Sequence, residues 1–420
     1  SYNSLICIQE GNTYMAKFAD RIAYMQETSD VIRYLFESMT DPETISFGGG
    51  APAKEALPVE AVRKIASQVL SRDQRGSQAL QYGNPMGIPD LRQAVIDRLL
   101  APKGLKAGLE NVIIVGGGIE SLYLTCQLYI EPGDVILVES PTFVHAVQVF
   151  KMFQAKCIAC ETDDNGLVLE DVEAKIKQYA PKMVYVIPTF QNPSGRTLSL
   201  ERRRALAELG SQYDLVIMED DPYCELRYSG KALPPVKYFD ESGNTVYVNS
   251  FSKIFSPGSR LGYIFADEEI TRKAYEVKMA TNSHTNVVTQ ILCAEFFNQG
   301  YFEPHLKRFC DIHRERRDVM MDCIHTMLPA EVKSVYPEGG LFTWLELPGQ
   351  IDTTSMLKEA VAQKVAYMPG REFFVQEHPS RDNSMRVSFG GVEPERIRVG
   401  MERLAKVIKA KLLSTNIGII

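Results

Sequence analysis

The sequence lacks the features that mark several special classes of protein. Its 420 residues contain eight cysteines and one tryptophan, and so few thiols do not make a disulfide-stabilised scaffold. No apolar run approaches the roughly 18 residues that cross a bilayer. The 53 acidic residues outnumber the 46 basic ones, giving a formal net charge of -7, and no long basic block occurs. We therefore expect a globular protein of the reducing cytoplasm, with neither nucleic acid nor a membrane as a partner.

Three local patterns are interpreted as structural or uninformative. Cys157 and Cys160 form a lone CxxC pair without a histidine at zinc-ligand spacing, so we expect no metal site. We interpret both as small buried apolar residues, with a redox pair as the weaker alternative. The run from Arg314 to Arg317 is interrupted by an acid, and we interpret it as a solvent-exposed helix face. The first fourteen residues lack the basic start and cleavage site of a signal peptide.

Short apolar runs alternate with helical patterns along most of the chain. Strands are predicted at residues 112–115, 135–138, 183–187, 215–218, 246–248 and 261–265. Nearly continuous apolar strands separated by helices are typical of a largely parallel sheet that is covered on both faces. A long charged helix is predicted over 303–327, followed by alternating strands at 341–345 and 385–389, which indicate a smaller α+β domain. We predict an α/β fold with an N-terminal segment (1–61) packed on the small domain, a large domain (62–300) and a small C-terminal domain (301–420).

The densest group of polar side chains follows the predicted strand at 246–248. A loop there carries Ser250, Ser252, Lys253 and Arg260. Ligands of open α/β sheets bind at the carboxyl ends of strands. A lysine in a dry site near another cation has a lowered pKa and can attack an aldehyde, and the arginine can hold a phosphate through paired donors. Taken alone, this stretch fits an ordinary surface loop equally well.

Residues at two further strand ends favour a ligand site over an ordinary surface loop. Gly116, Gly117 and Gly118 follow a strand and open a helix, where backbone amides can bind an anion. Their spacing differs from GxGxxG, which argues against a nicotinamide-dependent oxidoreductase. Asp220 lies just after the strand at 215–218, where a buried carboxylate would hold a basic ring nitrogen protonated, although a turn before Pro222 is the simpler alternative. An anion cradle, a reactive lysine and such a carboxylate together describe a pyridoxal 5'-phosphate site.

With these motifs in this order, the chain resembles the fold-type I, class I/II pyridoxal-phosphate-dependent aminotransferases. The resemblance runs from about residue 32 to the C-terminus and is greatest to the kynurenine/α-aminoadipate aminotransferase subgroup. The segment Ser250-Phe-Ser-Lys253 is similar to the family's Schiff-base motif. The resemblance therefore implies that Lys253 carries the cofactor and acts as the general acid and base.

The resemblance also implies the other cofactor contacts. Asp220 would hold the pyridine nitrogen, because the family spacing places Tyr223 three residues later and so favours Asp220 over Asp221. Tyr223 and Asn192, in Asn192-Pro-Ser-Gly195, would contact the ring hydroxyl. Phe143 would stack on the pyridine ring. The phosphate would be bound by the backbone amides of Gly118 and Ile119, the hydroxyls of Ser250 and Ser252, and the guanidinium of Arg260.

Four more residues are implied to bind substrate or to join subunits. Arg386 would clamp the substrate α-carboxylate with paired donors, and Gly50 would contact it through the backbone. Arg33 would meet a distal carboxylate. Tyr82 would reach the phosphate of a neighbouring subunit, which implies a homodimer with shared active sites.

The implied reaction moves an amino group from an L-amino acid to a 2-oxo acid such as 2-oxoglutarate. The donor would be acidic, such as 2-aminoadipate or glutamate, or aromatic. A pyridoxal-phosphate-dependent lyase or decarboxylase on the same scaffold is one alternative. A non-catalytic regulator body is another, disfavoured because about 45 residues before Phe47 are too few for a winged helix and linker.

Overall fold

The larger of two principal sheets has seven strands. The computed structural model describes residues 17–25, 30–71, 73–349 and 351–417. The strand order is β2-β10-β9-β8-β7-β3-β4. The strands are β2 (Val112–Val115), β3 (Val135–Glu139), β4 (Lys156–Cys160), β7 (Met183–Val186), β8 (Val216–Asp220), β9 (Thr245–Ser250) and β10 (Gly262–Phe265). All pairs are parallel except those of β10, which runs antiparallel to both β2 and β9. The predicted, largely parallel sheet is confirmed.

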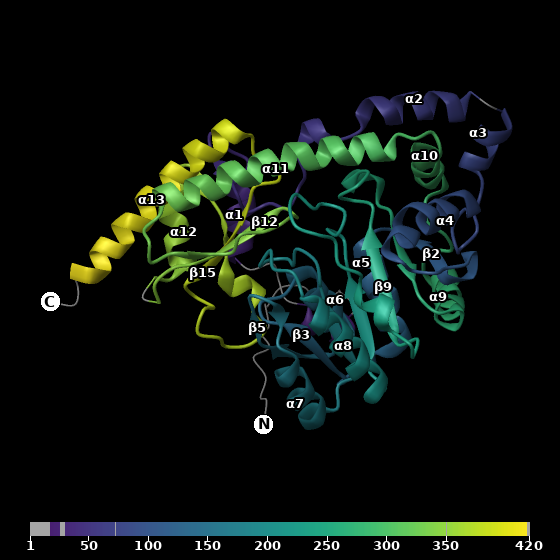
Figure 1. Ribbon diagram of the computed structural model, residues 1–420, viewed down its shortest axis with the longest axis horizontal. Coiled ribbons are helices and arrows are strands. Elements are labelled where there is room, and N and C mark those ends of the chain that lie inside the picture. The colour runs from purple at the N-terminus through teal and green to yellow at the C-terminus, as the bar shows by residue number, and fades with distance from the viewer. Residues whose placement is uncertain (1–16, 26–29, 72, 350, 418–420) are drawn as a thin grey trace.

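Helices cover both faces of this sheet (Figure 1). Side chains alternate between two cores, so that Tyr185 and Met218 pack on one face and Val184 and Ile217 on the other. The first face is covered by α5 (Gly118–Tyr129), α6 (Val144–Met152) and α10 (Val287–Asn298), and the second by α7 (Leu169–Tyr179) and α8 (Leu200–Gln212). Other helices of this part are α2 (Val59–Leu70), α3 (Asp73–Leu80), α4 (Pro89–Val95) and α9 (Glu268–Thr281).

The second sheet is antiparallel and has four strands in the order β11-β12-β15-β14. These are β11 (Lys333–Ser334), β12 (Phe342–Glu346), β14 (Met368–Pro369) and β15 (Ser384–Ser388), accompanied by α12 (Thr353–Ala362) and α13 (Pro394–Ile417). Part of the N-terminal segment joins this region, because β1 (Ile45–Ser46) pairs in parallel with β13 (Val365–Ala366), whereas Ala53 and Ala56 pack in the core of the large sheet. The chain also has a short helix, α1 (Asp30–Ser38). The exact domain boundaries stay a prediction.

The predicted long helix is α11 (Phe302–Met327), which runs along the upper edge of the molecule from α10 toward α13 (Figure 1). It supplies Phe302 and Phe309 to the core of the large sheet and Met320 and Ile324 to the core of the small one.

The interpretation of residues 314–317 as a solvent-exposed face was wrong for its last two residues. Arg316 and Arg317 are only 1% and 3% exposed. Arg316 donates to the Gly390 carbonyl and pairs with Glu55, while Arg317 donates to the Pro337 carbonyl. The partners lie far away in the sequence, which is why the local pattern did not reveal them.

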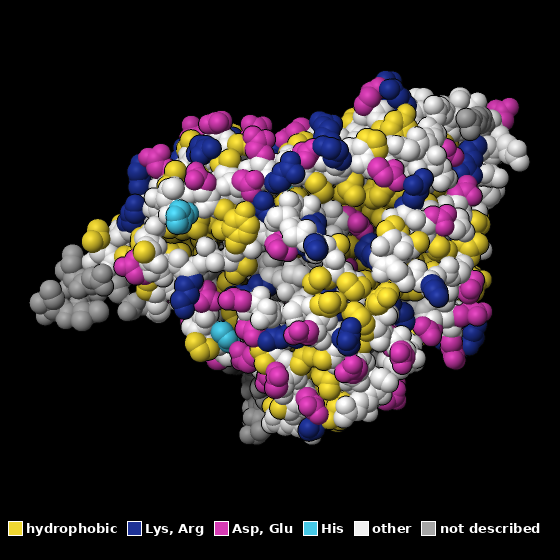
Figure 2. Space-filling model, viewed as in Figure 1, with side chains coloured by type: hydrophobic (Ala, Val, Ile, Leu, Met, Phe, Trp, Pro, Cys, Tyr) yellow, Lys and Arg dark blue, Asp and Glu magenta, His cyan; other side chains and the backbone are white. Residues whose placement is uncertain are grey.

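The CxxC cysteines lie on the edge strand β4 and pack toward opposite cores, Cys160 toward the α7–α8 face and Cys157 toward the other. Among the described residues no acidic, histidine or cysteine cluster could hold a metal ion. Nor does any helix in the described ranges have the length and apolar character needed to span a membrane. Figure 2 shows basic and acidic side chains interspersed over the face in view.

Candidate active site

A cavity of about 260 Å³ lies between the two sheets. Strands β8 and β9 of the large sheet end at this cavity, and helix α5 begins there. Strands β14 and β15 of the small sheet form the opposite wall. The cavity is lined by every predicted site residue except Tyr82 and Arg33: Gly50, Gly118, Ile119, Phe143, Asn192, Asp220, Tyr223, Ser250, Ser252, Lys253, Arg260 and Arg386. The predicted residues therefore form one site, as expected for the carboxyl edge of an α/β sheet.

Lys253 follows the end of β9, and its Nζ donates a 2.8 Å hydrogen bond to the Gly50 carbonyl. Burial lowers the pKa of this lysine to about 8, and the nearby charges of Arg386 and Arg260 act in the same direction. A large fraction of neutral amine therefore exists near pH 8, which is the form that attacks a carbonyl carbon.

Donors for an anion gather where β9 ends and α5 begins. Gly118 and Ile119 open α5, whose first N–H groups lack helical carbonyl partners. Ser250 Oγ and Ser252 Oγ lie 2.9 Å apart beside them. Gly117 has φ +97°, and a Cβ there would come within 2.5 Å of Arg260 Nη2. The glycine thus leaves room for the arginine at the anion cradle.

Asp220 ends β8 and is 5% exposed. Burial raises its pKa to about 7, and a hydrogen bond from the Tyr185 hydroxyl opposes this increase. Asp220 forms no ion pair with any described residue. A buried carboxyl group in this position becomes fully ionised when a cation such as a protonated ring nitrogen arrives beside it.

Arg386 lies on β15, with its guanidinium 4.3 Å from the ring centre of Phe342 and 5.0 Å from that of Phe373. It donates to Asn192 Oδ1 at 2.8 Å and to the Gly48 carbonyl at 2.6 Å, but in the described structure it forms no ion pair and its buried Nε has no partner. Burial lowers the pKa of Arg386 to about 10, so that the group still carries its charge at neutral pH. A buried cation without a counterion is a receptor for an anion such as a carboxylate.

Asn192 and Tyr223 are hydrogen-bonded neighbours that line the cavity. Asn192 Nδ2 donates to the Tyr223 hydroxyl at 3.5 Å, and burial raises the pKa of that phenol. Both residues line the same cavity as Asp220.

Several residues of the site were missed by sequence reasoning. Tyr185 is fully buried and bonds Asp220, while Phe342, Met368 and Phe373 form an apolar wall of the cavity. His145 lines the cavity as well. The hydroxyl of Tyr185 at an otherwise apolar strand position was a usable signal, whereas nothing local to Phe373 indicated its role.

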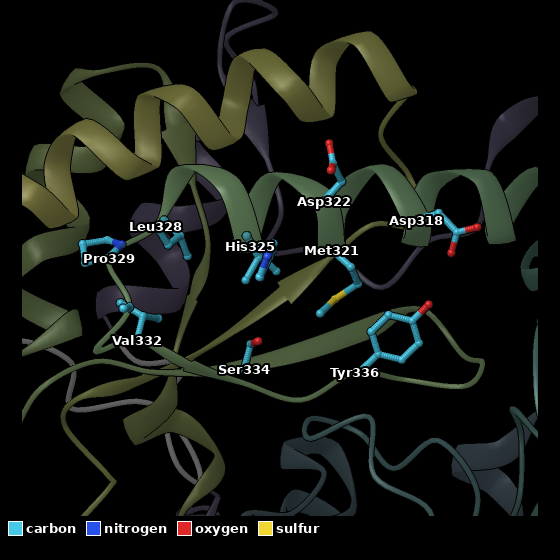
Figure 3. A pocket seen from close by; sticks show the side chains of 11 residues that line it. Asp318, Met321, Asp322, His325, Leu328, Pro329, Val332, Ser334 and Tyr336 are labelled. Atoms are coloured by element: carbon cyan, nitrogen blue, oxygen red, sulfur yellow. The ribbon is translucent and has the colours of Figure 1, made fainter.

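A second cavity, of about 670 Å³, lies under α11 and beside β11, with Met321, Leu328 and Tyr336 among its lining residues (Figure 3). None of the predicted site residues lines it, and it holds neither a lysine nor an arginine. It does not provide the chemistry found between the sheets.

The comparisons with known proteins agree with this site. The family model of aminotransferase class I and II matches residues 42–404. Aromatic-amino-acid aminotransferase 1 of Thermococcus litoralis is 38% identical over 404 residues, covering 95% of each chain. The 2-aminoadipate transaminase of Thermus thermophilus is 31% identical and covers 91% of this chain and 95% of its own. A crystal structure of Pyrococcus horikoshii kynurenine aminotransferase in complex with PMP has 36% identity and a TM-score of 0.89, covering 94% of this chain and 97% of that one.

The described residues fit the cofactor of these relatives. The cavity combines an amine of lowered pKa, a cradle for a phosphate and a buried carboxyl group without a counterion. Pyridoxal phosphate needs these three groups for its aldehyde, its phosphate and its ring nitrogen. The chain therefore belongs to the class I and II aminotransferases, fold-type I enzymes that use pyridoxal phosphate, and lies close to their kynurenine and aminoadipate subgroup.

Proposed function

We propose that the enzyme moves the amino group of an aromatic L-amino acid to an acidic 2-oxo acid such as 2-oxoglutarate. The observation that carries this proposal is the cavity wall beside Arg386, which consists of Phe342, Met368 and Phe373. A substrate whose α-carboxylate binds Arg386 places its side chain near these groups. Aromatic rings gain more from this apolar wall than small or charged side chains do.

We assign the acidic acceptor to Arg33 on α1. Leu35 of the same helix is buried and packs in one cluster with Met368 and Phe373 of the cavity wall. Arg33 is exposed, two residues from Leu35. Side chains two residues apart on a helix point to different sides, so the proposed contact with the distal carboxylate of 2-oxoglutarate, glutamate or 2-aminoadipate requires α1 to turn Arg33 toward the cavity.

Bound pyridoxal phosphate supplies an aldehyde that captures the substrate amine and a protonated ring that accepts the electron pair from Cα. In this proposal the amides of Gly118 and Ile119, the two serine hydroxyls and Arg260 hold the phosphate. Asp220 keeps the ring nitrogen protonated, Asn192 and Tyr223 orient the ring oxygen, and Phe143 packs on the ring.

The chain's own proton transfers centre on Lys253. Its Nζ takes the proton from the substrate Cα and later returns one, and the burial that lowers its pKa favours the neutral amine that the first transfer needs. Arg386 and the backbone of Gly50 hold the substrate carboxylate while this occurs, so that the Cα–H bond stays within reach of the amine.

We also propose a homodimer with shared sites. Tyr82 is 87% exposed on the single chain, follows α3 and contacts His284 edge-to-face. Leu80 beside it is 78% exposed. These two apolar side chains suit a subunit contact, and the Tyr82 hydroxyl would reach the neighbouring phosphate from there.

A half-reaction panel tests the proposed substrates. The cofactor-loaded protein is mixed with phenylalanine, kynurenine, 2-aminoadipate, glutamate or alanine while the visible absorbance of the cofactor is followed and the products are identified. We expect the aromatic donors to react fastest and to give their 2-oxo acids. Faster reaction of alanine would contradict the aromatic wall, and release of CO₂ or of ammonia without amino transfer would show a decarboxylase or a lyase.

A further inference from the structure

The carbonyl groups that meet Lys253 and Arg386 come from a segment without regular structure. Residues 48–53 form neither helix nor strand, so no backbone ladder fixes them. The Gly50 carbonyl accepts from Lys253 at 2.8 Å and the Gly48 carbonyl accepts from Arg386 at 2.6 Å. The position of this segment therefore depends on its contacts with the surrounding elements, including those of its last residue, Ala53.

One such contact comes from His313 on α11. The Ala53 amide donates to His313 Nε2 at 3.1 Å, and His313 Nδ1 lies 2.7 Å from the Phe309 carbonyl. A carbonyl only accepts, so Nδ1 carries the proton and Nε2 is the acceptor. Both ring nitrogens are used, and the ring is neutral.

The surroundings hold the imidazole in this form. His313 is fully buried and its ring stacks on Phe309 with centres 4.1 Å apart. Burial lowers its pKa to about 4, and Arg316 acts in the same direction. The amide of Ala53 is itself buried, so without Nε2 it would have no acceptor in its place.

We infer that His313 is a positioning residue that anchors residues 48–53 and thereby places Gly48 and Gly50 against Arg386 and Lys253. This inference rests on the proposed role of Arg386 and Gly50 in holding the substrate carboxylate. Both donor and acceptor carry that carboxylate, so the anchor acts on both substrates. It does not act on the phosphate cradle at the start of α5.

Two variants of similar size separate the acceptor from the bulk of the side chain. In His313→Gln an amide oxygen can still accept from Ala53, and in His313→Met it cannot. We expect His313→Met to raise KM about tenfold for both phenylalanine and 2-oxoglutarate, with kcat changed less than about threefold. Binding of the inhibitor 3-phenylpropionate, a carboxylate without an amine, should weaken about tenfold as well. His313→Gln should stay within about threefold of the unaltered enzyme.

The Kd of pyridoxal phosphate and the behaviour of Met320→Ala provide the controls. Met320 is buried on the same helix but packs in the other core, so its variant should lose stability without a change in KM.

The inference is overturned if His313→Met leaves KM unchanged, if both His313 variants change it equally, or if the cofactor Kd changes as much as KM. Should the Met variant not fold, nitrogen NMR of the unaltered protein decides, because a protonated Nε2 on His313 would overturn the inference. If the unaltered enzyme does not react with aromatic donors, the proposed substrates are refuted instead. The KM values of the two His313 variants are then compared with that of the unaltered enzyme for the donor that does react.

Discussion

The hydroxyl of Tyr185 donates a 2.8 Å hydrogen bond to Oδ2 of Asp220. Both side chains are buried, one on β7 and the other at the end of the adjacent strand β8. The bond stabilises the anionic carboxylate and so opposes the increase in the pKa of Asp220 that burial causes. The tyrosine therefore adjusts the charge of the group assigned to the ring nitrogen.

Tyr185→Phe removes this hydroxyl and little else. The pKa of Asp220 in the cofactor-free protein should rise above about 7. In the loaded enzyme the less stabilised carboxylate should hold the ring-nitrogen proton less well, so that the basic limb of kcat moves to lower pH. We expect kcat at neutral pH to fall about tenfold. The matched control is Tyr263→Phe, since the buried Tyr263 hydroxyl has no partner in the described structure. Superimposable pH profiles of kcat for Tyr185→Phe and the unaltered enzyme would contradict the assignment.

The charge of Arg386 contributes to the low pKa of Lys253. In Arg386→Met that pKa should rise, so less neutral amine is present at a given pH. Capture of pyridoxal phosphate by the cofactor-free protein should then show its acid limb at higher pH than in the unaltered protein, which stopped-flow absorbance measures. Lys253→Ala, measured alongside, should show no capture at any pH. Capture by that variant would mean that another amine carries the cofactor.

Arg33→Ala tests whether this arginine binds a distal carboxylate. We expect the acceptor 2-oxoglutarate to show an about tenfold higher KM, because one charge-assisted contact is lost, while the KM of phenylalanine is unaffected. Steady-state kinetics with both substrates measure this, and Arg314→Ala on the surface of α11 is the control. Equal relative kcat/KM for acidic and neutral substrates in Arg33→Ala and the unaltered enzyme would refute the role.

If the active sites are shared between subunits, two variants that are each defective should regain activity when they form a hybrid dimer. A hybrid of Tyr82→Ala and Lys253→Ala contains one site with an intact lysine and an intact tyrosine from the other chain. After mixing and reassembly, about a quarter of full activity should return at limiting cofactor. Mixing Asp220→Ala with Lys253→Ala should restore nothing, because both groups belong to the same chain's site. The absence of restoration in the first mixture would place Tyr82 outside the neighbouring site.

Local sequence was sufficient to predict an element where its hydrophobic pattern alone determined the structure. The four residues of β2 were predicted to the residue, because a short apolar run between a charged segment and a glycine cluster has few other solutions. The cavity followed from the same logic, since residues after apolar strands meet at one edge of the sheet. The spacing of the resembling family favoured Asp220 over the adjacent Asp221, and of the two only Asp220 lines the cavity.

Long-range relationships were not accessible in this way. The antiparallel direction of β10 leaves no mark on its apolar residues. The buried state of Arg316 depends on Gly390, 74 residues away, and the bond of His313 joins residues 260 positions apart. Such pairings depend on the assembled fold, because either partner alone resembles an ordinary polar residue.

The shared helix α11 has a consequence for how the protein unfolds. Its 26 residues extend about 39 Å and belong to two hydrophobic cores at once. If either core melted, the half of α11 that packs in it would lose its apolar contacts. The helical turns of that half would then no longer stabilise the turns of the other half. Heat should therefore disrupt both cores in one cooperative transition, and the two sheets act as a single thermodynamic unit.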